Sequence, residues 1–117
     1  MRRRPTDDLE ARLFAPRETL HAPHLLDVEV AQALRHYAAR DEISAARGQS
    51  LIDLLGRLPI TRYPHDSLLD RIWSLRHNLT AYDAAYVALA EALDARLVTA
   101  DERLAAAPRN RAKIEVV

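Results

Sequence analysis

The sequence contains no cysteine and only two glycines, Gly48 and Gly56, among its 117 residues. The lack of cysteine excludes disulfides, thiol nucleophiles and cysteine-ligated zinc sites. With so few glycines, the chain has no glycine-rich loop of the kind that cradles phosphates. Its apolar runs are too short for a membrane-spanning helix. The basic residues 1–5 lead into acidic positions rather than an apolar signal core, so we expect a soluble cytoplasmic protein with no membrane partner.

An excess of charge of one sign is also lacking. Seventeen basic and seventeen acidic residues cancel, so the net charge does not indicate a nucleic-acid partner. All the basic residues except Lys113 are arginine, which binds phosphate as a planar fork, although a bias in codon usage would produce the same skew. Hydrophobic residues make up 49% of the chain, as in ordinary globular proteins. Without a repeat or a linker, this length predicts one domain over residues 1–117.

The order of hydrophobic patterns alternates helices with short strands. Helical periodicity or capping residues predict helices over residues 6–14, 26–40, 44–55, from 67 onward, and 81–94. Short apolar or β-branched runs predict strands over residues 19–25, 59–63, 96–100 and 113–117. Gly56 is expected to end the second long helix, and residues 67–70 match a capping box. Strands separated by helices indicate an α/β domain with a short parallel sheet.

Three acidic residues lie at positions that favour a shared site. Glu29 follows the first predicted strand by one helical turn, Asp83 opens the helix over 81–94, and Asp101 directly follows the strand over 96–100. The carboxyl ends of parallel strands meet at one edge of a sheet, so these side chains are expected to converge there. Clustered carboxylates bind hard cations such as Mg²⁺ or Mn²⁺, which activate water and stabilise charge on a scissile phosphate.

Each of these acids also has a purely structural interpretation. Thr80 and Asp83 have the spacing of a capping box, in which the carboxylate stabilises the helix N-terminus. Thr99 and Glu102 have the same spacing, which would leave Asp101 as a first-turn carboxylate favoured by the helix dipole. Glu29 shares a helix face with other polar residues, so it also fits a solvated surface. Only the joint placement of the three acids favours a site.

Other residue types give weaker indications. The five histidines show no metal-ligand spacing and no pairing with a serine nucleophile, so we expect surface or packing roles for them. Tyr82, Tyr86 and Trp73 have rings that can stack on bases, although aromatic residues at helical spacing more often belong to a core.

Three segments together resemble a known family. They read LDVEV at residues 26–30, LTAYDAAYVALAE at residues 79–91 and LVTADERL at residues 97–104. Their order and the helices between them resemble the PIN-domain family of VapC-type toxins, over nearly the whole chain. The resemblance implies a three-layer α/β/α domain acting as a cytoplasmic, Mg²⁺-dependent endoribonuclease, with Mn²⁺ as a substitute. It also implies a structured RNA substrate of the transfer or ribosomal class, a VapB-type antitoxin and a homodimer.

The resemblance also assigns roles to the acids. Glu29, Asp83 and Asp101 match the second, third and fourth acids of the family's metal site, and Thr99 matches a frequent neighbouring hydroxyl. The implied chemistry is metal-assisted phosphodiester hydrolysis, in which one acid binds the ion and another orients the attacking water. The sequence does not assign these two roles to particular residues.

The departure from the family pattern lies at the N-terminus. Family members begin with a central apolar strand that ends in an aspartate, whereas residues 1–6 contain no such run and include Pro5. Asp7 and Asp8 fall in the start of a predicted helix, so neither is assigned as the first acid. Our hypothesis is a chain that starts late or is shortened, lacking the first, central strand and needing another molecule to fill its place.

Two other classes of function stay open at this point. A catalytically impaired binding module would still capture the antitoxin or an RNA, but would not need a bound metal ion. A structural α/β fragment would use Asp83 only to cap its helix, so that replacing this residue would change stability by about 1 kcal/mol and nothing else.

Overall fold

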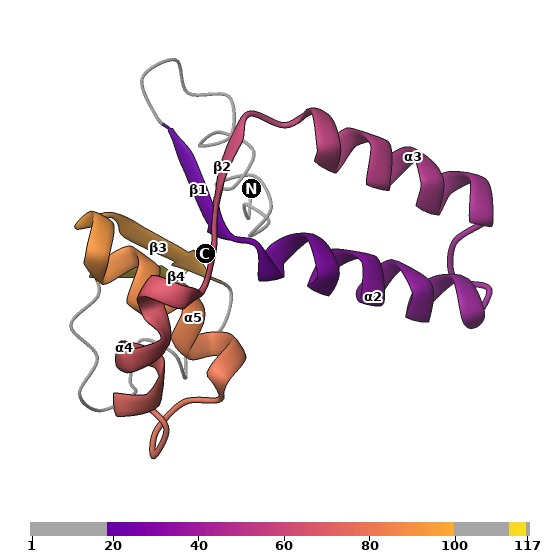
Figure 1. Ribbon diagram of the computed structural model, residues 1–117. Coiled ribbons are helices and arrows are strands. Elements are labelled where there is room, and N and C mark those ends of the chain that lie inside the picture. The colour runs from indigo at the N-terminus through magenta and orange to yellow at the C-terminus, as the bar shows by residue number, and fades with distance from the viewer. Residues whose placement is uncertain (1–18, 100–112, 117) are drawn as a thin grey trace, which may run out of the picture.

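The computed structural model describes residues 19–99 and 113–116, and its elements follow the alternation predicted from the sequence (Figure 1). The predicted helix over residues 6–14 lies outside this part of the chain. In chain order the elements are β1 (Leu20–Pro23), α2 (Leu25–Ala39), α3 (Ala45–Arg57), β2 (Ile60–Tyr63), a 3₁₀ turn (Asp66–Leu68), α4 (Leu69–Ser74), α5 (Ala81–Leu93), β3 (Arg96–Thr99) and β4 (Lys113–Val116).

The four strands form two parallel pairs. Strand β1 pairs with β2 in the register Leu20 to Ile60, and β3 pairs with β4 in the register Arg96 to Lys113. Helix α5 packs against both β1 and β3, so it spans the two pairs. The parallel α/β arrangement is confirmed, but no strand within residues 19–99 and 113–116 joins β1 to β3. The expectation of an absent central strand concerns residues 1–18, which lie outside the described part.

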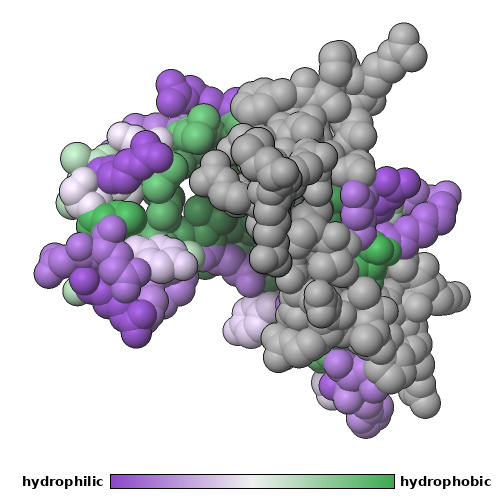
Figure 2. All heavy atoms as spheres, turned by 180° about the vertical axis from the view of Figure 1, so that it is seen from behind, coloured by the Kyte–Doolittle hydropathy of each residue, from purple (hydrophilic) through white to green (hydrophobic). Residues whose placement is uncertain are grey.

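Helices α2 and α3 form a hairpin that extends away from the strands and from α5 (Figure 1). The reversal uses Asp41 in the left-handed region, at φ 57°, and Ser44 caps α3 by accepting a hydrogen bond from Arg47 N at 3.0 Å. Neither helix contains a buried residue. In the view from behind, apolar side chains run through the middle of this lobe and hydrophilic ones lie above and below (Figure 2). The two helices therefore shield each other's apolar sides only in part.

Two local predictions are wrong. Gly56 does not end α3, because the helix continues to Arg57 and stops where Leu58 turns extended, with ψ of 139°, before Pro59. Residues 67–70 do not form a capping box. A 3₁₀ turn over Asp66–Leu68 leads directly into α4, whose N-cap residue Leu68 makes no side-chain hydrogen bond to the helix. A chain that enters a helix from a 3₁₀ turn already has helical backbone angles, so Ser67 cannot act as an extended N-cap residue.

The core lies where α4 meets α5. Leu75, Ala84 and Val87 are completely buried, and Leu68, Ala88 and Leu89 form an adjoining buried group. The many alanines on α5 let α4 and the strands approach its backbone closely, which is how a helix with small side chains becomes central to a core. Among the described helices, none has the length and apolarity needed to cross a membrane. Helix α5 supplies most of the buried side chains of the described core.

Candidate active site

Glu29 forms a hydrogen bond with Tyr86, a residue from a distant part of the chain. It is an exposed residue in the second turn of α2, and the Tyr86 hydroxyl of α5 donates a hydrogen bond to its Oε1. The two residues are 57 positions apart. They meet because α2 starts directly after β1 and α5 packs against that same strand. Glu29 is therefore an exposed residue, as its alternative interpretation expects, that also makes a contact with α5.

Asp83 lies one turn before Tyr86 on α5. Residues three apart share a helix face, so the partly buried Asp83 lies on the same face of α5 as Tyr86. Its backbone N donates to Thr80 Oγ1 at 3.2 Å, which is the first half of the predicted capping box. The return bond from the Asp83 carboxylate to Thr80 N is not made among the described residues. The cap thus uses the backbone of Asp83 and does not engage its carboxylate.

The pKa of the Tyr86 hydroxyl depends on its burial and on the acids around it. Burial raises the pKa of the Tyr86 hydroxyl, and the hydrogen bond to Glu29 raises it further. Three negative charges act in the same direction, those of Glu29, Asp27 and Asp83. Negative charges around a hydroxyl disfavour its ionisation. Tyr86 therefore stays protonated, and a hydrogen-bond donor, at neutral pH.

Asp27 is the acid that the sequence analysis did not single out. Arg62 Nε donates to its Oδ2 at 2.7 Å, while the same guanidinium donates to the carbonyl oxygens of Leu55 and Ile60 at 3.0 and 3.3 Å. The hydrogen bond to Asp27 raises the pKa of Arg62. The second oxygen, Oδ1, is shielded from solvent and has no hydrogen-bond partner among the described atoms. The only signal for Asp27 in the sequence was its place two residues before Glu29.

The donor set suits a hard divalent cation. Carboxylate oxygens are the ligands that Mg²⁺ and Mn²⁺ prefer, and Glu29 on α2 and Asp83 on α5 could supply them. Asp27 adds a shielded oxygen nearby, with its charge partly balanced by Arg62. Asp101 lies outside the described residues, as does the side chain of Thr99. Within residues 19–99 and 113–116, no three acids or histidines are close enough together to hold an ion by themselves.

The histidines have structural roles at the same strand ends. His65 Nε2 accepts a hydrogen bond from Leu25 N at 3.1 Å and so caps α2, whose own N-cap residue, His24, makes no side-chain bond to the helix. His21 Nδ1 is 2.7 Å from the Tyr63 hydroxyl, which links β1 to β2 through side chains. These contacts agree with the surface and packing roles expected for histidine.

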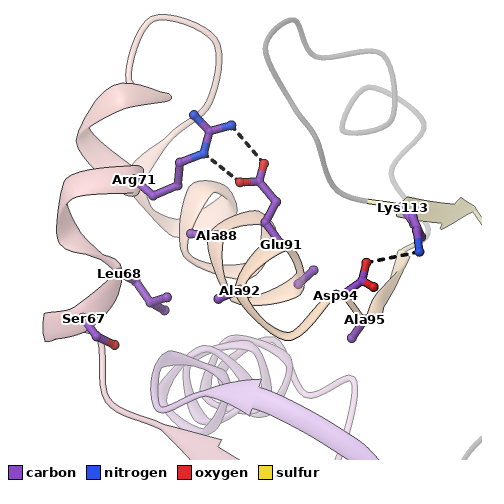
Figure 3. Close-up of a pocket in the computed structure, with 10 residues that line it drawn as sticks. Ser67, Leu68, Arg71, Ala88, Glu91, Ala92, Asp94, Ala95 and Lys113 are labelled. Atoms are coloured by element: carbon purple, nitrogen blue, oxygen red, sulfur yellow. Dashed lines mark hydrogen bonds and ion pairs between the residues drawn. The ribbon is translucent and has the colours of Figure 1, made fainter.

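A pocket of about 500 Å³ lies at the other end of α5 (Figure 3). Arg71 and Glu91 form a bidentate ion pair across it, with N–O distances of 2.7 and 3.0 Å, and Lys113 contacts Asp94 at 3.1 Å. Asp83 and Asp94 are eleven residues apart, a rise of about 16 Å along a helix. The pocket is therefore separate from the carboxylates around Tyr86.

Comparison with known proteins identifies the family of this chain. A family model described as the PIN domain matches residues 1–110. VapC ribonuclease Mb0985 of Mycobacterium bovis is 50% identical over 111 residues, which cover 95% of this chain and 87% of that protein. Ribonuclease VapC1 of Mycobacterium tuberculosis is 52% identical over 98 residues, covering 83% and 74%. Ribonuclease VapC12 of the same species is 42% identical over 100 residues, covering 86% and 78%. The resemblance inferred from three sequence segments is confirmed, and the chain belongs to the PIN-domain family, in its VapC branch.

Proposed function

We propose that this chain is the toxin of a toxin–antitoxin pair and acts as an endoribonuclease that requires a divalent metal ion. One observation carries the proposal: Glu29 on α2 accepts a hydrogen bond from Tyr86 on α5, one turn after Asp83, although Glu29 and Asp83 are 54 positions apart in sequence. The ribonuclease names of the relatives support the reaction class.

In this proposal Glu29 and Asp83 hold the ion together with Asp101, and Mg²⁺ is its natural identity with Mn²⁺ as a substitute. A bound divalent ion activates water and neutralises the charge that builds on the scissile phosphate. The chain's own contribution is to hold the carboxylates in place. The α5 core fixes the backbone beneath Asp83, and Tyr86 holds one oxygen of Glu29. One acid of the set also orients the attacking water toward the phosphate.

The decisive experiment is cleavage of a labelled RNA pool by the purified chain, with and without Mg²⁺ or Mn²⁺. Asp83→Asn removes one charge from the proposed site, and Asp70→Asn is its matched control. Asp70 is also a first-turn carboxylate, on α4, but it is exposed and not among the charges that act on Tyr86. We expect metal-dependent cutting that Asp83→Asn abolishes and Asp70→Asn leaves unchanged. A folded chain that never cuts would refute the enzyme and favour the binding module.

The proposal also includes the class of RNA substrate, the oligomeric state and the antitoxin partner. We expect the substrate to be a structured RNA, of the transfer or ribosomal class, cut in the cytoplasm by a homodimeric single-domain protein. We also expect a VapB-type antitoxin to bind and inhibit it. Sedimentation of the purified chain tests the dimer. Cleavage of transfer RNA compared with an unstructured strand of equal length tests the substrate class, and equal rates on both would contradict it.

A further inference from the structure

We infer that Tyr86 is a positioning residue of this site: its hydroxyl holds Glu29 Oε1 and fixes the orientation of a carboxylate that would hold the ion. The inference rests on the proposed function. It concerns a residue that carries no negative charge at neutral pH and therefore does not count among the acids of the metal site.

Glu29 needs such support because its own helix does not provide any. It is exposed on α2, and its side chain has several rotatable bonds that water leaves free to turn. Among the described residues, the Tyr86 hydroxyl is its only hydrogen-bond partner. A carboxylate that samples many rotamers binds a cation more weakly than one already held in place, because the cation must then order it.

Tyr86 is suited to this role by where it sits on α5. Its neighbours Ala85 and Val87 are buried, so the backbone that carries Tyr86 is held by the core, and its own side chain is partly buried. A tyrosine ring has only two side-chain torsions, so a packed ring presents its hydroxyl at a well-defined point. Asp27 is already bound by Arg62, and the hydroxyl donates its hydrogen bond to Glu29.

The same helix provides a matched control. Tyr82 lies one turn before Tyr86, is 61% exposed and makes no described hydrogen bond. Tyr86→Phe and Tyr82→Phe each remove a single oxygen atom and keep the ring. Only the first removes the bond to Glu29, so a difference between the two variants reports on that bond.

The test is Mn²⁺ binding by isothermal titration calorimetry, with RNA cleavage measured over a range of Mn²⁺ concentrations. Tyr86→Phe is expected to weaken Mn²⁺ binding by about tenfold, the usual loss when a residue that orients a ligand is changed. Its cleavage rate should return toward the unmodified level at saturating Mn²⁺, because the ligands themselves remain. Tyr82→Phe should match the unmodified protein in both measurements. Equal Mn²⁺ affinity in all three proteins would overturn the inference.

A measurement on the metal-free protein separates this inference from the proposed function. Carbon-13 NMR of the Glu29 carboxyl should show a shift in Tyr86→Phe and none in Tyr82→Phe. Should the unmodified chain bind no Mn²⁺ and cut no RNA, the proposed function fails and the inference fails with it. Should it do both while Tyr86→Phe behaves identically, the inference alone fails. Glu29→Asp, one methylene shorter, is a second variant with the same expected defect, and unweakened Mn²⁺ binding by it would count against the inference.

Discussion

The ion pair between Arg71 and Glu91 joins α4 to α5, and breaking it is the most informative perturbation of the fold. Glu91→Gln keeps the size of the side chain and one acceptor oxygen but removes the charge. The pair is bidentate, at 2.7 and 3.0 Å, and its side chains are 25% and 12% exposed. The bond to Glu91 raises the pKa of Arg71. The guanidinium also stays charged without that carboxylate, because arginine is not deprotonated in proteins.

The loss of stability expected for Glu91→Gln lies between two limits. Exposed ion pairs contribute about 0–1 kcal/mol, whereas breaking a fully buried pair costs about 3–5 kcal/mol. Water still reaches part of Arg71, and glutamine retains one acceptor, so we expect Glu91→Gln to lower the free energy of unfolding by about 2 kcal/mol. For a chain of 117 residues, a loss of 1 kcal/mol in the free energy of unfolding lowers the thermal unfolding midpoint by about 4 °C. The midpoint of Glu91→Gln should therefore fall by about 8 °C.

The assay is urea and thermal unfolding, followed by circular dichroism, of the unmodified chain, Glu91→Gln and Asp94→Asn. The Asp94 variant is the control because its ion pair with Lys113 is 84% and 70% exposed and lies on the same pocket. Asp94 is also the left-handed cap residue of α5, a conformation that asparagine adopts readily. We expect Asp94→Asn to change stability by less than about 0.5 kcal/mol. If the two variants lose the same stability, the argument from burial and geometry is refuted.

Three further substitutions test individual parts of the fold by the same unfolding assays. Leu75→Ala should cost about 3 kcal/mol because Leu75 is completely buried, and a loss below about 1 kcal/mol would contradict its place in the core. His65→Ala should cost about 1 kcal/mol by removing the acceptor that caps α2, and unchanged stability would show that the cap contributes nothing. Gly48→Ala should stabilise α3 by about 0.8 kcal/mol, since its added Cβ meets Ile43 Cδ1 at an ordinary 3.7 Å, and destabilisation would indicate a clash.

Local signals in the sequence determined most of the elements. Alternation of apolar runs placed all four strands to within about two residues, and helical periodicity placed α2, α3 and α5. Thr80 was correctly identified as a helix cap, because an N-cap bond spans only three residues and depends on little else. The predicted helix end at Gly56 and the predicted cap at Ser67 were wrong because the backbone there has another conformation. Gly56 lies within α3, and Ser67 lies within a 3₁₀ turn.

The candidate site stays a prediction. Glu29 and Asp83 were proposed from their positions relative to the strands and from the family resemblance, and the structure adds that Glu29 binds Tyr86, one turn after Asp83. The roles of Tyr86 and of Asp27 with Arg62 were missed, since each depends on a partner 35 to 57 positions away. No local pattern encodes such a pairing.

The sequence by itself therefore determined which segments are helices and strands, which family the chain belongs to, and which acids are candidates for its chemistry. Only the tertiary structure decided which side chains hold those acids. Packing of α5 against β1, where α2 begins, brings Tyr86 to Glu29, while β1 and β2 pair to bring Arg62 to Asp27. Contacts of this kind arise from how packed elements cross in space, which periodicity along one segment does not specify.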